Sequence, residues 1–559
     1  IVGLIVSAFQ GAVVEVPESG ALVLAPSGQL VEELSDDALT RSFAEAQGLP
    51  PSETLVRDLT GALRAAADDD RIQAVVLSLD DLQGGGLSKL RDIAAAIVAF
   101  KETGKEVIAM GDSYTQAQYY LAAHADTVFM HPFGAVYLEG FGYFRAYFRE
   151  ALDNLRIDMN VFRVGQYKSF VEPFTRNDMS EEDAEAARRW LEALWAVYRE
   201  DVAEARGIDA DSINTYANEL ADRVEASAGN LAEVAIEADL VNGLRGRLDF
   251  VDYMMGLVGP GEDGESGYSG IRHSDYLRAI RLGEGQDQPA NVGVIVASGQ
   301  IVDGLAPPGT VGGDSLAALI GQAAFDDSVD AVVLRVDSPG GSMFASEVVF
   351  EALHALKETG KPLVASMGST AASGGYYIAM PADEIWADET TITGSIGVGA
   401  LLPTFQRSLA EVGVRTDGFG TTRLSGQASP LIGLGPEARR VLQASVEEAY
   451  RQFLNRVMDT RDMSFERADN LAQGRVWAGT DALELGLVDA IGDLDGAISV
   501  AAERAGLTGA DYGVRYIQRE VSFRERLAMG MVSAAHGVLD WFGLTGGPGI
   551  VNGAVARFA

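Results

Sequence analysis

Short apolar runs and helical patterns alternate along much of the chain. Residues 331–336 form a run of β-branched and other apolar side chains, which is typical of a buried strand. A helical pattern follows over 346–357, a second strand is expected at 362–367, and a further helix is expected from Ser373 onward. Longer helical patterns cover residues 180–206 and 436–460. Strands that alternate with helices predict βαβ units around a parallel sheet, which is the α/β fold class.

The same pattern occurs twice, because the chain contains an internal repeat. Residues 74–80 read AVVLSLD and residues 331–337 read AVVLRVD, while KETGK occurs at 101–105 and again at 357–361. The two copies stay 256 or 257 residues apart over this stretch, and chance does not maintain such a register. We therefore predict two tandem homologous domains, each with a parallel sheet and flanking helices.

The predicted domain limits follow from this repeat and from local composition. Residues 256–290 are rich in Gly, Pro, Ser, Asp and Glu, and we expect them to be an interdomain linker. The other divisions are 1–20, the first repeat at 21–255, the second repeat at 291–520, and a C-terminal tail at 521–559.

Both ends of the sequence have a membrane-related interpretation. Residues 1–9 read IVGLIVSAF, an apolar run that is shorter than the roughly 20 residues needed to span a bilayer. This run is either the last part of an N-terminal signal anchor or a buried first strand. Within 521–544, apolar residues recur near helical spacing, so an amphipathic helix is expected to pack in an oligomer or lie at a membrane interface.

Charge and composition narrow the classes of function. Hydrophobic residues make up 47% and charged residues 22% of the chain, which is typical of a folded globular protein. The net charge of −38 argues against a nucleic-acid partner, because phosphates would be repelled. The absence of cysteine excludes disulfides, thiolate metal sites and a cysteine nucleophile. The five histidines show no metal-ligand spacing, and we expect neither a metal nor a cofactor.

Two glycine-containing segments of the second repeat suggest acyl-transfer chemistry. The segment DSPGGS at 337–342 follows a predicted strand, and AASGGY at 371–376 places Ser373 at the start of a predicted helix. A helix N-terminus would stabilise negative charge near the serine oxygen. The backbone N–H groups of Gly374 and of Gly340 or Gly341 are then expected to hold the oxyanion of a tetrahedral intermediate.

The first repeat serves as an internal control for this interpretation. The position that corresponds to Ser373 is Gln116, and the loop that corresponds to SPGG reads DLQG at 81–84. If the Ser-Gly-Gly sequence were needed only for folding, both copies would tend to keep it. The difference therefore favours a catalytic role for Ser373 over a structural one.

A serine nucleophile needs a base, and a lysine is the best candidate in this chain. No GxSxG pattern surrounds Ser373, and no histidine lies in a suitable sequence context. Lys168 lies among apolar and aromatic residues in VGQYKSFVEPF, where burial would lower its pKa. Its counterpart in the second repeat falls near Ser425, where no lysine is close. We therefore predict one site, shared between the repeats, with Ser373 as nucleophile and Lys168 as general base.

Longer motifs carry a resemblance to a known family. They are YKSxVEPF at 167–174, DSPGGS at 337–342, AASGGYY at 371–377, ITGSIGV at 392–398 and GRVWxGxxAxxxGLVD at 474–489. On these motifs the chain resembles the signal peptide peptidase A family in its long, duplicated bacterial form, with the fold of the Clp protease proteolytic subunit and the crotonases. The resemblance implies a Ser/Lys dyad at Ser373 and Lys168, with Ser395 orienting the lysine amine.

The resemblance also implies a setting and a substrate class. It implies a homo-oligomer, expected as a tetramer, held in the bacterial inner membrane by an N-terminal anchor with its catalytic domains on the periplasmic side. Its substrates would be remnant signal peptides and other short apolar peptides, cleaved through an acyl-enzyme. Two alternatives stay open at this point. They are a crotonase-like acyl-CoA enzyme and a non-catalytic membrane scaffold.

Overall fold

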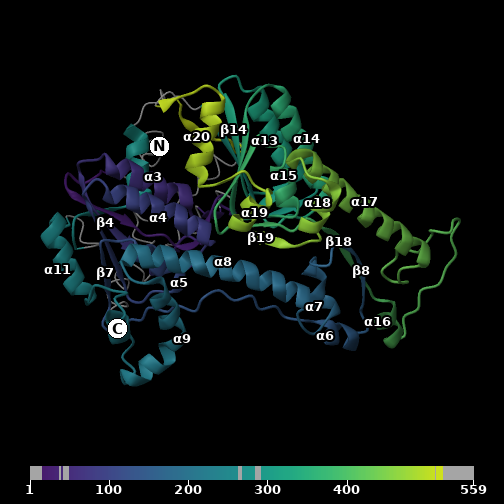
Figure 1. Ribbon diagram of the computed structural model, residues 1–559, viewed down its shortest axis with the longest axis horizontal. Helices are drawn as coiled ribbons and strands as arrows, with labels where there is room; N and C mark the ends of the chain where they lie inside the picture. The colour runs from purple at the N-terminus through teal and green to yellow at the C-terminus, as the bar shows by residue number, and fades with distance from the viewer. Residues whose placement is uncertain are drawn as a thin grey trace, which may run out of the picture.

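The protein has two α/β halves, each built around its own mainly parallel sheet (Figure 1). The computed structural model describes residues 15–36, 40–41, 49–261, 267–283, 291–509 and 512–519. Residues 1–14 of the expected anchor segment and residues 520–559, which contain the expected tail helix, lie outside this part. Within the described part, no helix combines the length and the apolar character that a membrane crossing requires.

The sheet of the first half has six strands, all parallel to their neighbours, in the order β10-β1-β4-β6-β7-β9. These strands are β10 (Gly270–Arg272), β1 (Gly20–Leu24), β4 (Ile72–Ser78), β6 (Glu106–Gly111), β7 (Thr127–Met130) and β9 (Gly243–Leu244). A small separate sheet contains β2 (Gly28–Val31), β3 (Glu53–Leu55) and β5 (Leu82–Gly84).

Helices pack against this sheet, and further helices follow along the chain. The helices are α3 (Val56–Ala67), α4 (Leu87–Lys101), α5 (Gln116–Ala123), α6 (Arg149–Asn154), η1 (Ser169–Val171), α7 (Glu172–Thr175), α8 (Glu181–Arg206), α9 (Ala210–Ala226), α10 (Leu231–Glu237), α11 (Arg247–Val258) and α12 (His273–Gly283). Side chains of α3, α4 and α5 pack with apolar residues of β1, β4 and β6 into one continuous core.

The second half repeats this arrangement. Its main sheet has the order β19-β17-β15-β14-β11-β21, with β16 and β20 attached beside β15. The strands are β11 (Val292–Ser298), β14 (Ala331–Ser338), β15 (Leu363–Ala372), β16 (Glu384–Ala387), β17 (Ile392–Gly394), β19 (Val476–Ala478), β20 (Ala490–Ile491) and β21 (Val514–Tyr516). Only β19 runs antiparallel within this sheet, against β17. A two-stranded pair, β12 (Gln300–Val302) and β13 (Thr310–Gly312), lies apart from it.

The helices of the second half complete the repeat. They are α13 (Gly313–Phe325), α14 (Met343–Glu358), α15 (Gly374–Ala379), α16 (Gln406–Glu411), α17 (Pro436–Arg461), α18 (Phe465–Leu471), α19 (Gly479–Leu485) and α20 (Leu494–Arg504). The predicted α/β class with tandem repeated domains is therefore confirmed. The predicted strand at 362–367 is longer than expected, because β15 continues to Ala372 and ends beside Ser373.

The expected linker at 256–290 needs a correction. Within its described residues, β10 pairs in parallel with β1, so that Ala21 lies opposite Gly270. Helix α12 follows at once, and its Tyr276 and Leu277 are buried in the core of the first half. Composition suggested a linker because polar and small residues surround these short elements. This part of the range instead completes the edge of the first sheet.

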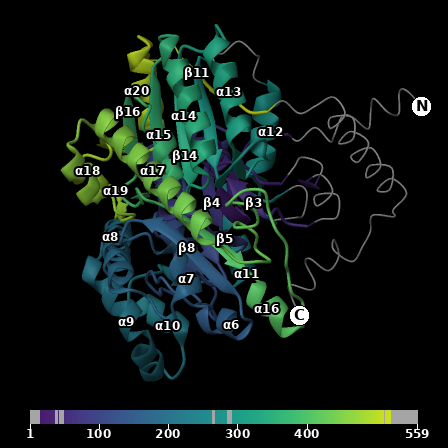
Figure 2. The ribbon, with the colours of Figure 1, turned by 90° about the vertical axis from the view of Figure 1, so that its right-hand side faces the viewer.

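One antiparallel strand pair joins the two halves directly. Strand β8 (Asp158–Val164) of the first half pairs with β18 (Val398–Thr404) of the second half over seven residue pairs. The buried Asn160 strengthens this pair, because its side-chain amide donates to the Leu402 carbonyl at 3.0 Å and to Thr404 Oγ1 at 3.1 Å. Figure 1 shows these strands beyond the ends of both sheets, near α7 and α16, and Figure 2 shows β8 beneath α17. The pair holds the segment after β8 against the second half.

Candidate active site

Lys168 follows β8 and reaches across to the second half. Its Nζ lies 3.0 Å from Ser373 Oγ, 2.8 Å from the Ser395 carbonyl oxygen and 3.0 Å from Ser395 Oγ. Three residues that the sequence identified from separate motifs therefore meet at one nitrogen atom. Because β8 is hydrogen-bonded to β18, the lysine is carried into the second half by main-chain structure and does not depend on a flexible loop.

The surroundings of Lys168 favour its neutral form. Burial lowers the pKa of this lysine to about 7, from an ordinary value near 10.5, since a charged amine loses solvation there. Within the described residues, no carboxylate forms an ion pair with Lys168 that would oppose this shift. About half of such lysines are neutral at pH 7, which suits a general base.

The three oxygen atoms around Nζ match what a neutral amine requires. A neutral amine has two N–H donors and one lone pair, whereas the protonated form has three donors. If both N–H groups donate to the carbonyl and hydroxyl of Ser395, the lone pair is left to accept the proton of Ser373. Ser395 thus offers two acceptors, its carbonyl oxygen and its hydroxyl, that can hold the amine of Lys168 in place.

Ser373 lies in a sharp turn between β15 and α15. Its backbone has φ 54° and ψ −117°, which is unusual for a residue with a side chain. Such conformations cost on the order of 1–3 kcal/mol and persist only where the surroundings enforce them. Here the Ser373 N–H donates to the Gly394 carbonyl at 2.8 Å, which ties the turn to β17. The turn brings Ser373 Oγ to the amine of Lys168.

The expected oxyanion donors do not all remain available. The Gly340 N–H donates to Ser338 Oγ at 3.1 Å, so it is already used inside the loop. Among the hydrogen bonds of the described residues, none has the N–H of Gly341 or Gly374 as its donor. Gly341 and Gly374 are therefore the better pair of donors. Helix α15, which starts at Gly374, has only six residues, so its dipole adds less than the sequence suggested.

Two of these glycines, Gly340 and Gly374, are required by close packing. A Cβ atom on Gly340 would lie 2.5 Å from Gly374 N and 2.9 Å from Ser373 Cβ. A Cβ atom on Gly374 would lie 3.1 Å from Gly341 N and 2.7 Å from Ser346 Oγ. Side chains at these positions would fill the space between the two backbone segments that face the nucleophile. The Gly-Gly pairs therefore allow the loop and the serine turn to approach each other.

The corresponding position in the first half is closed by a side chain. Gln116 Oε1 accepts the N–H groups of Glu139 at 3.1 Å and Gly140 at 2.8 Å, and its Nε2 donates to the Gly140 carbonyl. Helix α5 begins there with an ordinary capping box at Thr115, without the strained turn of Ser373. The first copy therefore keeps the scaffold and uses the Gln116 side chain to tie the start of α5 to the loop at 139–140.

Sequence reasoning missed the residues that pack around the stem of Lys168. Gly474 has φ 78°, and a Cβ atom there would lie 2.7 Å from both Lys168 N and Lys168 Cβ. A Cβ atom on Gly397 would lie 3.3 Å from Lys168 Cδ, and one on Gly165 would lie 2.6 Å from the Gln473 carbonyl carbon. Gly474 opens the GRVW motif, so the signal was present in the sequence. Its role depends on a contact across more than 300 positions, which no local pattern reveals.

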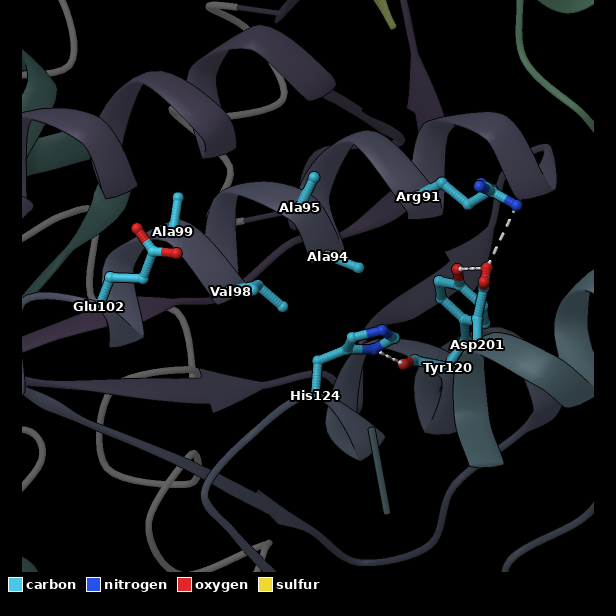
Figure 3. Close-up of a pocket in the computed structure, with 9 residues that line it drawn as sticks. All are labelled: Arg91, Ala94, Ala95, Val98, Ala99, Glu102, Tyr120, His124 and Asp201. Carbon is cyan, nitrogen blue, oxygen red and sulfur yellow. Dashed lines mark hydrogen bonds and ion pairs between the residues drawn. The ribbon is translucent and has the colours of Figure 1, made fainter. Parts of the chain in front are cut away.

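A pocket of about 380 Å³ lies elsewhere, between α4, α5 and α8 of the first half (Figure 3). His124, directly after α5, points into it, and its Nδ1 donates to the Tyr120 carbonyl at 2.8 Å. Burial lowers the pKa of this histidine. Arg91 and Asp201 approach to 3.4 Å at one end of the pocket. Its lining residues include none of those that surround Lys168 and Ser373.

Comparison with known proteins gives the relatives of this chain. Peptidase family S49 matches residues 99–259 and 355–508, one stretch in each half. Protease 4 of Salmonella typhi is 38% identical over 524 residues, which cover 93% of this chain and 84% of that protein. Protease 4 of Haemophilus influenzae is 40% identical over 491 residues, which cover 87% and 79%. The chloroplastic serine protease SPPA of Arabidopsis thaliana is 30% identical over 491 residues, covering 84% and 68%.

Proposed function

The chain belongs to peptidase family S49, and we propose that it degrades signal peptides with Ser373 and Lys168 as its catalytic dyad. It is a serine endopeptidase, as its family and its relatives indicate. The single observation that carries the assignment of the dyad is the position of Lys168 Nζ, 3.0 Å from Ser373 Oγ and held by Ser395.

The proposed reaction begins with acylation of the serine. Neutral Lys168 takes the proton of Ser373 Oγ as that oxygen bonds to the carbonyl carbon of the substrate. Negative charge develops on the carbonyl oxygen, which the N–H groups of Gly341 and Gly374 are placed to stabilise. The tetrahedral intermediate then collapses, the C–N bond breaks, and protonated Lys168 gives its proton to the leaving amine.

Deacylation uses the same groups in the reverse sense. Departure of the C-terminal fragment, which carries the new amino terminus, leaves room for a water molecule near Lys168, which is neutral again. The lysine takes a proton from this water as its oxygen attacks the acyl-enzyme ester. Collapse of the second intermediate breaks the ester C–O bond, and the proton returns from Lys168 to Ser373 Oγ. No cofactor takes part in this cycle.

The substrates we propose are short, extended and apolar, as remnant signal peptides are. Small residues flank the nucleophile, since Ala371 and Ala372 precede it and Gly374 and Gly375 follow it. Such surroundings suit an extended substrate whose backbone pairs with a strand edge of the enzyme. They also favour small substrate side chains near the cleaved bond. A crotonase-like acyl-CoA reaction is the rival chemistry. Hydrolysis of an apolar fluorogenic peptide, without turnover of an acyl-CoA thioester, is the expected result that separates the two.

We propose a location on the periplasmic side of the bacterial inner membrane as part of this function. The support is the apolar run at residues 1–9, which is a type of segment that an N-terminal anchor contains. Fractionation of cells that express the protein tests this point. Protease protection in spheroplasts tells the periplasmic side from the cytoplasmic side. Recovery in the soluble cytoplasmic fraction would contradict it.

We also propose a homo-oligomer, with a tetramer as the expected form. At the 257-residue spacing that relates Ser373 to Gln116, β18 corresponds to residues 141–147 and β8 corresponds to residues 415–421. Within the described part of the chain, neither of these two counterparts has a strand partner. Along residues 141–147, half-buried and exposed side chains alternate, and Phe144 and Phe419 are almost fully exposed. Pairing of 141–147 with 415–421 of another copy would reproduce the β8–β18 pair between subunits.

A further inference from the structure

A second lysine of the first half is buried against the second half. Lys89, in the first turn of α4, has a side chain that is only 6% exposed. Its Nζ lies 2.6 Å from Asp337 Oδ2 and donates to Ser369 Oγ at 3.0 Å. The neighbouring Ser88 Oγ lies 2.8 Å from the same Ser369 Oγ. Helix α4, which carries both residues, lies at the boundary between the two halves in Figure 1.

The partners of Lys89 lie where the two central strands of the second sheet separate. Val336 of β14 pairs with Met367 of β15, but the next pair joins Ser338 to Ala371. Between these two pairs, β14 has one residue, Asp337, whereas β15 has three, 368–370. Strand β15 therefore carries two extra residues at this irregularity. Asp337 Oδ1 accepts the N–H of Thr370 at 3.0 Å, so the carboxylate that binds Lys89 also holds the extra residues of β15.

Both catalytic segments leave from this irregularity. Ser373 follows Thr370 by three positions along β15, and Gly340 follows Asp337 by three positions along the loop after β14. The side chain of Asp337 also packs on the backbone of Gly368, where a Cβ atom would lie 3.2 Å from Asp337 Cβ. A shift of the Asp337 carboxylate would therefore move the start of the oxyanion loop and the end of the nucleophile strand together.

We infer that Lys89 is a positioning residue for the proposed reaction. From the first half, it fixes Asp337 and the 368–370 irregularity so that Ser373 and the N–H groups of Gly341 and Gly374 keep their relative placement. The inference rests on the proposed function, because it concerns the rate of that reaction. Its consequence is that the first half contributes two lysines in different roles, Lys168 at the reacting atoms and Lys89 behind them.

The alternative is that Lys89 only stabilises the packing of the two halves. Buried ion pairs are costly to break on one side, since the remaining charge is left without a partner. The same helix offers a matched control for this effect. Arg91 also reaches the second half, with Asp388 at 3.1 Å and Glu389 at 2.7 Å, and it has no contact with Asp337 or Ser369 among the described residues.

The test compares Lys89→Met with Arg91→Met in the full chain, with an apolar fluorogenic peptide as substrate. We expect Lys89→Met to lower kcat by roughly 10- to 100-fold while KM changes by less than about threefold, because small misplacements of reacting groups have effects of this size. Arg91→Met should keep kcat within about twofold of the wild type. Circular dichroism melts establish that both variants are folded at the assay temperature.

Two further measurements separate positioning from stability. The double variant Lys89→Met/Asp337→Asn removes the unpaired carboxylate and keeps an oxygen acceptor for the Thr370 N–H. Its kcat should therefore be at least about fivefold higher than that of Lys89→Met alone. The acid limb of the pH–rate profile should not move in Lys89→Met, since Lys89 does not contact Lys168. A wild-type kcat in Lys89→Met, or a loss equal to that of Arg91→Met, would overturn the inference. Wild-type protein that cleaves no peptide would instead overturn the proposed function.

Discussion

The amine of Lys168 lies 3.0 Å from the hydroxyl of Ser373, although 205 positions separate the two residues in the sequence. Each belongs to a different copy of the internal repeat, and each is replaced in the other copy. The β8–β18 pair is the structural reason that they meet, because it brings the segment after β8 of one copy to Ser373 of the other. Residues from two similar domains thus lie together at one candidate site.

Removal of the Ser395 hydroxyl should slow the reaction without abolishing it. In Ser395→Ala, the carbonyl oxygen still accepts one N–H of Lys168, but the second acceptor is lost. The loss of one hydrogen bond of about 1–2 kcal/mol predicts a decrease in kcat of roughly 5- to 30-fold. Steady-state kinetics at pH 8 measure this effect. An unchanged kcat would show that the hydroxyl does not orient the base.

A single methyl group at Gly374 should block the oxyanion site. The backbone of Gly374 is compatible with alanine, but the new Cβ would lie 3.1 Å from Gly341 N. We expect Gly374→Ala to lower kcat by about 100- to 1000-fold, which is the usual effect of losing an oxyanion donor. Gly321→Ala is the control, since a Cβ there meets no atom within 4 Å. Full activity in Gly374→Ala would place the oxyanion elsewhere.

The buried base should cost the protein stability in a pH-dependent way. Folding lowers the pKa of Lys168 from near 10.5 to about 7, so the unfolded chain binds more protons between these values. The penalty is therefore fully present below pH 7 and fades as the pH rises toward 10. Lys168→Met should raise the free energy of unfolding by roughly 2–4 kcal/mol at pH 6.5, and by much less at pH 10. Urea denaturation at both values measures the difference.

The outcome that contradicts this account is equally specific. If Lys168→Met is no more stable than the wild type at pH 6.5, the lysine is not held in an environment that disfavours its charge. A stability gain that is the same at both pH values would point to better apolar packing of methionine. Neither result would fit a base whose pKa is lowered by burial.

The proposed contact between subunits can be tested because the chain has no cysteine of its own. If the two counterpart segments pair in the same register as β8 and β18, Ala146 lies opposite Thr416 of a second copy. Mild oxidation of Ala146→Cys/Thr416→Cys should therefore give covalently linked subunits on a non-reducing gel. Ala146→Cys/Arg415→Cys is the control, because neighbouring strand positions face opposite sides. A monomer in light scattering, without cross-linking, would contradict the proposal.

The sequence predicted the regular parts of this protein well. The repeated β–α–β pattern, the helices at 346–357 and 436–460 and the α/β class all follow from periodicities that local packing preserves. The observed helices α14 and α17 begin and end within a few residues of these ranges. The repeat also supplied the comparison of Ser373 with Gln116. The structure supports this comparison, because the Gln116 side chain occupies the corresponding position of the first half and accepts the Gly140 N–H.

Features that depend on the exact course of a loop, on very short strands or on contacts between the halves could not be predicted. The use of the Gly340 N–H by Ser338 depends on the exact course of one loop. The role of Gly474 against Lys168, and the ion pair of Lys89 with Asp337, join positions that only the folded chain brings together. The strand at 270–272 was missed because three residues among glycines and charged side chains carry too little pattern.

The most direct test of the central claim is the pH dependence of peptide hydrolysis from pH 6 to 10, measured for the wild type, Ser373→Ala and Lys168→Ala. For the wild type, kcat/KM should rise with an inflection near pH 7, because the lowered pKa of Lys168 sets the fraction of free enzyme that holds a neutral base. Both variants should fall to background at every pH. Substantial activity in Lys168→Ala, or an inflection near pH 10, would contradict the assignment of Lys168 as the base.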